Sequence, residues 1–355
     1  MKRYIPVLKF RKGTFVQLKL SVQDPAPVVE GDTPSDALNK TIDLARLVDE
    51  IGYTRFWMNE HHGIPSLASI APEVILARIG AETTNIRLGL GGLILPNYAP
   101  LKVAEIFRTL HTLHPDRVDL GIARSAGTPI PPSALRRERR TEPTDDYSEQ
   151  LQELLNFLGL DSFQIGDPFS NIQVAPKTPG TASVWMLGSS SRSSTMAARF
   201  GLPYAYSHFH NPVSTREAIE CYKNSFMPAH GYQSPRCVVF IGVLCAETHG
   251  DAERLQSSMR LFLQRAKAGQ VPQFEEPSRA LRKLALSQDN AASLEWPHFM
   301  VGTPDLVSRG LHEMAEALNV EEFILQTICW DHAARLRSYK LLASEMNLTD
   351  PIQPK

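Results

Sequence analysis

The sequence has little net charge, little cysteine and no long apolar run. Its 355 residues include 37 lysines and arginines against 38 aspartates and glutamates, which gives a net charge of −1. Nucleic-acid binding draws much of its affinity from excess positive charge, so we expect no nucleic-acid partner. No stretch of 18 uncharged apolar residues occurs, and the charged segment 1–13 does not have the form of a signal peptide. We therefore expect a cytoplasmic protein without a membrane span.

Cysteine is scarce and widely spaced. The four cysteines form no C-x-x-C pair: Cys221, Cys237, Cys245 and Cys329. This spacing favours reduced thiols over a disulfide framework or a thiolate zinc site. The composition, 43% hydrophobic and 21% charged, is typical of a globular protein with a large core.

Strand-like and helix-like segments alternate along almost the whole chain. The expected strands cover residues 15–22, 54–59, 86–95, 118–122, 183–187, 203–206, 237–245 and 322–327. The expected helices cover residues 35–51, 71–83, 101–113, 145–158, 193–200, 214–227, 250–266, 304–318 and 331–346. Eight strands that alternate with helices predict an α/β fold, a single (β/α)8 barrel of the TIM type that spans residues 1–355.

One alternative fold and two irregular segments accompany this prediction. A doubly wound open sheet with an appended domain would show the same alternation, but no G-x-G-x-x-G turn follows the first strand. Two long inserts, near residues 125–144 and 268–300, interrupt the rhythm. Loops of this length in a compact domain are usually lids or disordered segments, which is how we interpret both.

In a barrel of this kind the site forms where the strands end, so the residues just after each strand are its candidates. Glu60, His61 and His62 follow the second strand. Adjacent residues on an extended segment point to opposite sides, so at most one histidine faces the barrel mouth, in a catalytic or a merely structural role. Gly91 and Gly92 end the third strand. They permit a flat ligand to approach the main chain, or simply tight packing of the rim.

The next two strands end in residues suited to an anion. Arg124 follows the fourth strand and is able to bind phosphate or carboxylate in bidentate geometry, or to pair with Glu105 or Asp119. Residues 188–194 are rich in serine and lead directly into a helix. Backbone amides and hydroxyls at a helix N-terminus form a phosphate cradle, although single serines are also ordinary N-caps.

Two pairs of histidines have the spacing of metal ligands. His111 and His114 lie near the end of a helix, and His208 and His210 alternate at the end of a strand where they could share a face. No carboxylate or cysteine stands obviously beside either pair. Histidines near a helix C-terminus also complement its dipole. We therefore expect no metal site.

Three segments together resemble the bacterial luciferase-like flavin-dependent monooxygenases. Residues 56–127 contain the motifs E-H-H and I-R-L-G-x-G-G-x-x-L-P and an alanine–glutamate pair, residues 184–205 contain L-G-S-S, and residues 301–343 continue the similarity. The resemblance covers most of the chain apart from the two inserts. It implies a (β/α)8 barrel that binds FMN.

The resemblance also implies roles for individual residues. His61 matches the first histidine of E-H-H, which lies near the flavin and acts in proton transfer or in managing the oxygenated flavin. Gly91 and Gly92 match residues whose main chain, often through a cis peptide, lies against the flavin ring. The remaining matches contact the flavin phosphate or lie beside it: Arg124, Ser189, Ser190 and Ser193. The chain departs from the family pattern at Asp116 and Ala123, where the family has glycine, and neither change removes a group that the cofactor needs.

The activity implied by the resemblance is two-component oxygenation. Reduced FMN from a separate flavin reductase would react with O2 to give a flavin hydroperoxide, which would oxygenate a small organic substrate. An apolar rim of Leu93, Leu95, Trp185 and Tyr206 would exclude water from the cofactor. A homodimer is also implied by the family.

Two other functions remain compatible with the same residues. One is a deazaflavin-dependent oxidoreductase that transfers hydride. The other is a non-catalytic flavin-binding subunit that supports a catalytic partner.

Overall fold

The strands of the protein close into a parallel barrel. The computed structural model describes residues 17–124, 130, 132–135, 146–284 and 294–348. Within these residues, eight strands form the ring: β1 (Lys19–Asp24), β2 (Arg55–Met58), β3 (Arg87–Ile94), β4 (Val118–Ala123), β5 (Ser183–Gly188), β6 (Tyr204–Ser207), β7 (Cys237–Cys245) and β9 (Glu322–Gln326). Neighbouring strands pair in parallel around the ring, and β9 closes it against β1. The predicted (β/α)8 barrel is therefore confirmed.

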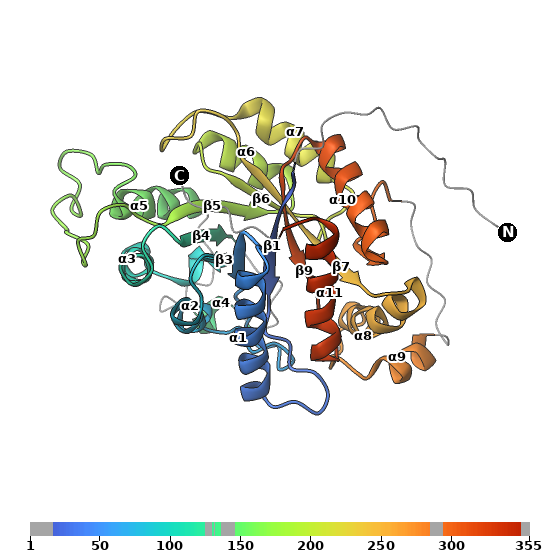
Figure 1. Cartoon of the computed structure of the whole chain (residues 1–355). Coiled ribbons are helices and arrows are strands. Elements are labelled where there is room, and N and C mark those ends of the chain that lie inside the picture. Colours follow the sequence, from blue (N-terminus) through green and yellow to red (C-terminus); the bar gives the residue numbers. More distant parts are fainter. Residues whose placement is uncertain (1–16, 125–129, 131, 136–145, 285–293, 349–355) are drawn as a thin grey trace.

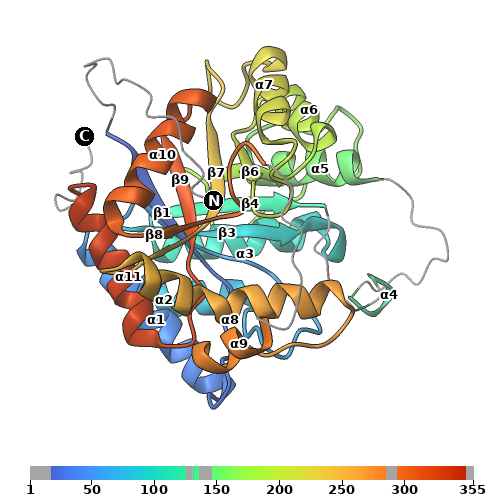
Figure 2. The same cartoon turned by 90° about the vertical axis from the view of Figure 1, so that its right-hand side faces the viewer.

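Helices surround the barrel on its outside (Figures 1 and 2). They are α1 (Pro34–Glu50), α2 (Pro72–Glu82), α3 (Pro100–Leu113), α4 (Pro132–Leu135), α5 (Tyr147–Leu158), α6 (Ser191–Arg199), α7 (Thr215–Ser225), α8 (His249–Lys267), α9 (Pro277–Leu284), α10 (Pro304–Leu318) and α11 (His332–Glu345), with a 3₁₀ turn, η1, at Leu95–Asn97. Proline stands in the first turn of α1, α2, α3 and α10, where its missing amide costs no helical hydrogen bond. None of the described helices is long and apolar enough to span a membrane.

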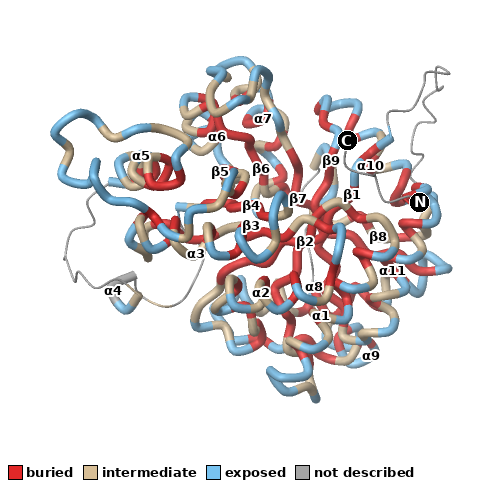
Figure 3. The backbone as a smooth tube through the Cα atoms, turned by 60° about the vertical axis from the view of Figure 1, so that its left-hand side comes forward, coloured by how far each residue is buried: buried red, intermediate tan, exposed pale blue. Residues whose placement is uncertain are grey.

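The core has two layers, because alternate residues of each strand face opposite sides of the barrel wall. One layer lies between the strands and the helices and includes Val184 and Met186 of β5. The other fills the barrel interior and includes Trp57, Trp185 and Phe240. Figure 3 shows buried residues along the strands and exposed residues on the outer helix faces and loops.

The prediction for the second insert is wrong over its described residues. They form α9, which packs against α8, and β8 (Phe299–Gly302), which pairs with the second half of β7. Phe274 is fully buried and stacks on Phe262 with ring centroids 4.1 Å apart. The sequence pattern did not predict these elements, because each is short and its burial depends on neighbours distant in sequence. Most of the first insert lies outside the described residues.

A buried network of charges closes the floor of the barrel, at the N-terminal ends of the strands. Arg55 places its Nη1 2.7 Å from Asp119 Oδ2 and its Nε 2.6 Å from Glu322 Oε1. Arg87 and the indole N–H of Trp57 also donate to Asp119. Burial alone would raise the pKa of Asp119, but the charges of Arg55 and Arg87 hold it below its usual value. The carboxylate is therefore ionised and fully partnered at neutral pH.

This network makes a prediction about stability. Asp119→Ala leaves Arg55 and Arg87 without their shared acceptor in a buried site, and we expect the free energy of unfolding to fall by about 3–5 kcal/mol. Asp305→Ala, which removes an exposed carboxylate 3.4 Å from Arg309, is the control and should change it by less than about 0.5 kcal/mol. Urea denaturation of both variants measures the difference. Equal losses in the two variants would show that the network does not stabilise the barrel.

Candidate functional site

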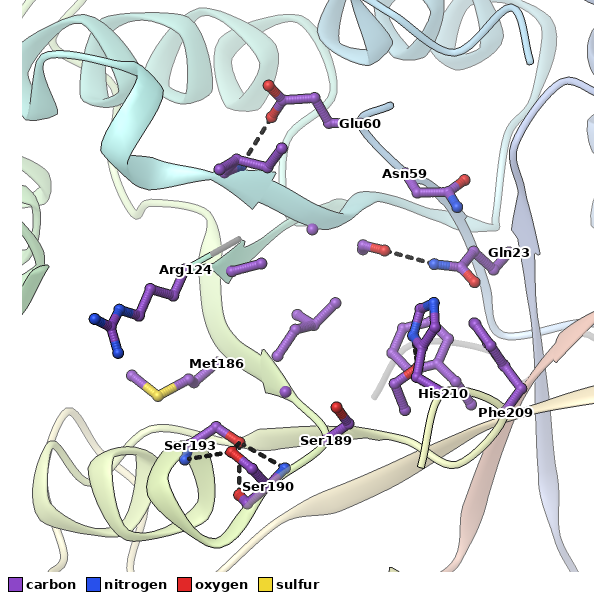
Figure 4. A pocket seen from close by; sticks show the side chains of 18 of the residues that line it. Gln23, Asn59, Glu60, Arg124, Met186, Ser189, Ser190, Ser193, Phe209 and His210 are labelled. Atoms are coloured by element: carbon purple, nitrogen blue, oxygen red, sulfur yellow. Dashed lines mark hydrogen bonds between the residues drawn. The ribbon is translucent and has the colours of Figure 1, made fainter. Parts of the chain in front are cut away.

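A cavity of about 450 Å³ lies where the strands end, at the opposite side of the barrel from the charged floor (Figure 4). Its walls come from the ends of β1 to β5, the first turns of α6, the loop after β6, and Phe240 of β7. The predicted site residues all line this one cavity: His61, Gly91, Gly92, Arg124, Ser189, Ser190 and Ser193. The structure thus brings them together, while their roles toward a ligand remain predictions.

The N-terminus of α6 forms one end of the cavity. Ser190 is the N-cap, and Ser190 and Ser193 form a capping box in which each side chain bonds the other's backbone amide. The Ser193 hydroxyl also lies 2.9 Å from the Tyr204 hydroxyl. A Cβ atom on Gly188 would lie 2.1 Å from Ser193 Oγ, so this close approach requires glycine. The serines therefore cap the helix and line the cavity at once.

Arg124 stands on the same side of the cavity as these serines, with Met186 between them (Figure 4). Asp119 is not its partner, because Asp119 is engaged by Arg55 and Arg87 at the far end of β4. Glu105 lies 3.2 Å from Lys102 on the surface of α3. Arg192, in the first turn of α6, lines the same end of the cavity. Two cationic side chains and a helix N-terminus suit a dianionic phosphate.

The end of β3 forms the wall beside this anion-binding end. The Gly91–Gly92 peptide is cis, and the register of β3 against β4 shifts there. Gln23 donates through Nε2 to the Gly91 carbonyl at 2.5 Å. A Cβ atom would lie 2.8 Å from Trp57 on Gly91 and 3.1 Å from a backbone oxygen on Gly92. The tight packing expected of these glycines is therefore confirmed, and they border the cavity; the approach of a flat ligand stays a prediction.

Glu60 lines the cavity beside this wall, and His62 lies next to it outside the lining. The Glu60 side chain is fully buried and accepts hydrogen bonds from the Ile94 amide at 2.7 Å and the Tyr98 hydroxyl at 3.0 Å. His62 Nε2 is 2.7 Å from the same carboxylate. Burial, together with the charge of Glu60, raises the pKa of Tyr98. Only His61 of the two histidines lines the cavity, as the alternation of an extended segment predicted.

His61 is held neutral in the cavity wall. Its Nε2 lies 2.9 Å from the Asn59 amide nitrogen. Its Nδ1 is buried, and among the described residues it has no hydrogen-bond partner. Burial lowers the pKa of His61 to about 4, and the nearby His210 and His62 act in the same direction. At pH 7 the ring therefore carries no charge, and one of its nitrogens has no partner among the described residues.

Sequence reasoning missed several residues of the cavity wall: Gln23, Asn59, Tyr147, Ser207, Phe209, His210 and Phe240. His210 bonds Ser207 through Nδ1 at 2.7 Å and lies against Phe209. His208 instead points away and bonds Thr215 and the Pro297 carbonyl. The expectation that His208 and His210 share a face is therefore wrong, because β6 ends at Ser207 and the chain turns.

The prediction of an apolar rim is also wrong. The four residues are buried and do not line the cavity: Leu93, Leu95, Trp185 and Tyr206. Leu93 and Leu95 face the helices, and Trp185 lies deeper in the barrel interior. The apolar side chains that do line the cavity are Ile94, Met186, Leu187, Met196, Phe209 and Phe240.

His111, which lies outside the cavity, has a protein partner. His111 Nε2 lies 3.1 Å from the Pro179 carbonyl, a role that fixes the loop before β5. Within the described residues, no group of three side chains is arranged to hold a metal ion.

The wall of the cavity yields a second stability prediction. Glu60→Ala removes the acceptor of the Ile94 amide and the Tyr98 hydroxyl, so we expect the free energy of unfolding to fall by about 2–4 kcal/mol. Glu105→Ala, at an exposed ion pair on α3, is the matched control and should be nearly neutral. Thermal and urea unfolding of both variants test this, and a neutral Glu60→Ala would contradict the assigned role.

Known proteins are similar in sequence to this chain over nearly its whole length. Residues 13–321 match the family described as luciferase-like monooxygenase. The chain is 34% identical over 333 residues to the protein YceB of Bacillus subtilis (strain 168), covering 92% of this chain and 98% of that protein. It is 33% identical over 334 residues to a protein of Escherichia coli (strain K12) named luciferase-like monooxygenase, covering 91% and 96%.

Solved structures share the fold. Apo-MsnO8 superposes with a TM-score of 0.88 at 43% identity, covering 94% of this chain and 99% of that chain. The oxygenating constituent of 3,6-diketocamphane monooxygenase from Pseudomonas putida, in complex with FMN, gives 0.71 at 19% identity, covering 95% and 100%. An F420-dependent secondary alcohol dehydrogenase gives 0.66 at 14% identity, covering 94% and 99%. The last two likenesses concern the fold alone.

Proposed function

Because the chain belongs to the luciferase-like monooxygenase family, we propose that it is a two-component monooxygenase that uses reduced FMN and dioxygen to oxygenate a small organic substrate. The observation that carries this proposal is the division of one cavity into two unlike ends. The end at α6 offers hydroxyls, helix amides and arginines, and the end at His61 offers side-chain amides, a neutral imidazole and aromatic rings. FMN has two matching parts, an anionic phosphate and an aromatic ring system with polar edges.

The phosphate would bind at the N-terminus of α6. Ser190 and Ser193 would donate hydroxyl hydrogen bonds, the first amides of the helix would add their dipole, and Arg124 would supply charge. Ser189 precedes this turn, and its carbonyl accepts from Asn211, which fixes the entry to the helix. These residues fit a dianion because no carboxylate lines this end of the cavity among the described residues.

The flavin ring would lie against the Gly91–Gly92 backbone. Two buried polar atoms without partners in the described structure, His61 Nδ1 and Asn59 Oδ1, belong to side chains at this end and fit a ring edge that carries donors and acceptors. Reduced FMN would supply two electrons, so that one atom of O2 enters the substrate and the other leaves as water. The protein orients the substrate, and Phe209, Phe240 and Leu187 keep water away from the reacting centre.

Two partners belong to this proposal. A separate flavin reductase would deliver reduced FMN to the cavity. We also expect a homodimer.

The F420-dependent relative of the same fold supports a second candidate, hydride transfer with a deazaflavin. The two candidates differ in their use of oxygen. Incubation with reduced FMN and a panel of aldehydes, ketones and aromatic compounds, followed for product and peroxide, tests the first. Oxygen-independent turnover with reduced deazaflavin would favour the second, and no turnover with either cofactor would favour a non-catalytic flavin-binding subunit.

A charge deletion tests the phosphate end. Arg124→Ala should weaken FMN binding about tenfold or more, because it removes a charge-assisted hydrogen bond to phosphate. Arg199→Ala removes the same charge from the opposite end of α6, away from the cavity, and should leave the Kd unchanged. Fluorescence titration with FMN measures both, and an unchanged Kd for Arg124→Ala would count against the phosphate role.

A second substitution tests the ring end. His61→Ala should retain FMN binding, because His61 lies away from the phosphate cradle, while oxygenated product falls by about 10²-fold and hydrogen peroxide rises. Product and peroxide are assayed with wild type and variant at equal flavin occupancy. Equal product yield would remove His61 from the mechanism.

A further inference from the structure

The loop after β2 holds two cavity-lining side chains in one fixed arrangement. The Ser69 hydroxyl donates to the Asn59 carbonyl, and the His61 amide donates to the Ser69 carbonyl at 3.0 Å. Ser69 is fully buried and clamps the backbone on both sides of Glu60. The side chains of Asn59 and His61 therefore meet at 2.9 Å between the amide nitrogen and Nε2.

With the Asn59 amide nitrogen facing His61 Nε2, this contact favours one position for the imidazole proton. The amide NH₂ of asparagine only donates hydrogen bonds, so His61 Nε2 must accept. A neutral imidazole carries one proton, which is then on Nδ1. That nitrogen is buried, belongs to a cavity-lining residue and has no partner among the described residues. Asn59 Oδ1, a hydrogen-bond acceptor, is likewise buried and has no partner among the described residues.

We propose that Asn59 is a positioning residue that holds neutral His61 in its Nδ1-protonated tautomer, so that the unpartnered ring position of His61 is a hydrogen-bond donor and not a base. The ligand group beside it would be an oxygen acceptor such as a carbonyl, with an N–H or O–H group beside Asn59 Oδ1. The tautomer follows from the protein alone; its part in oxygenation rests on the proposed function.

The surroundings of His61 preserve the neutral form. Burial lowers its pKa to about 4, and His210 and His62, the charged or titratable groups found to act on it, lower it further. His62 is itself engaged by the Glu60 carboxylate, and His210 by the Ser207 hydroxyl. A neutral N–H directed at a developing oxyanion stabilises negative charge without transferring a proton first.

Nuclear magnetic resonance of the protein without cofactor tests the tautomer directly. In protein labelled with ¹⁵N-histidine, long-range ¹H–¹⁵N spectra separate protonated from unprotonated ring nitrogens, and His61→Gln assigns the signals of His61. We expect Nδ1 protonated and Nε2 unprotonated at pH 7. The opposite pattern would overturn the proposal. Because no flavin is present, this result is independent of whether the chain is a monooxygenase.

Two variants of Asn59 test whether it sets the tautomer. N59D presents a carboxylate that only accepts, so the proton should move to Nε2 and the pKa of His61 should rise by about 1 to 3. N59L removes the partner, so the tautomers should mix. Unchanged His61 signals in both variants would reduce Asn59 to a structural role.

Ser207→Ala serves as the control. It removes the partner of His210 while leaving Asn59 in place, so the His61 tautomer should stay as in wild type. Circular dichroism establishes that each variant is folded, and N59D alone decides the matter if N59L does not fold. Under the proposed function, N59D should also introduce an ionisation near neutral pH into the rate profile that wild type lacks.

Discussion

The candidate site depends on how the end of β3 is held. Gln23, from β1, binds the Gly91 carbonyl on the barrel side, and Glu60, after β2, binds the Ile94 amide on the outer side. The backbone between these two hydrogen bonds changes register and forms the wall of the cavity. A buried carboxylate and a buried amide thus hold this stretch of main chain in the cavity wall. Every other cavity residue is placed around this stretch.

The charges of the protein are separated along the barrel axis. Buried ion pairs of Arg55, Asp119 and Glu322 fill the floor, where they neutralise one another. Positive charge is placed at the rim beside α6, and the imidazole of His61 at the other end is neutral at pH 7. A ligand with an anionic tail and an uncharged head therefore has one favourable orientation in the cavity.

The fold and the polar rim were predictable because strand ends in a parallel barrel gather at one face. His61, Arg124 and the serines directly follow strands, and all of them line the cavity. Predictions failed where the direction of a side chain depended on the alternation of residues along a strand or on a turn of the chain. Trp185 is on the inward face of β5 but below the cavity, and His208 leaves the barrel where the chain turns after β6. Gln23 and Asn59 were missed because one polar residue at a strand end has no pattern of its own. Its importance appears only with its partner in the folded chain, which is the Gly91 carbonyl for Gln23 and His61 for Asn59.

A crystal structure of the protein with FMN tests the central claim most directly. The account predicts the phosphate within hydrogen-bond distance of Ser190 and Ser193, and the ring against Gly91–Gly92 with its edge toward His61. A flavin bound in the reverse orientation, or outside this cavity, would contradict it.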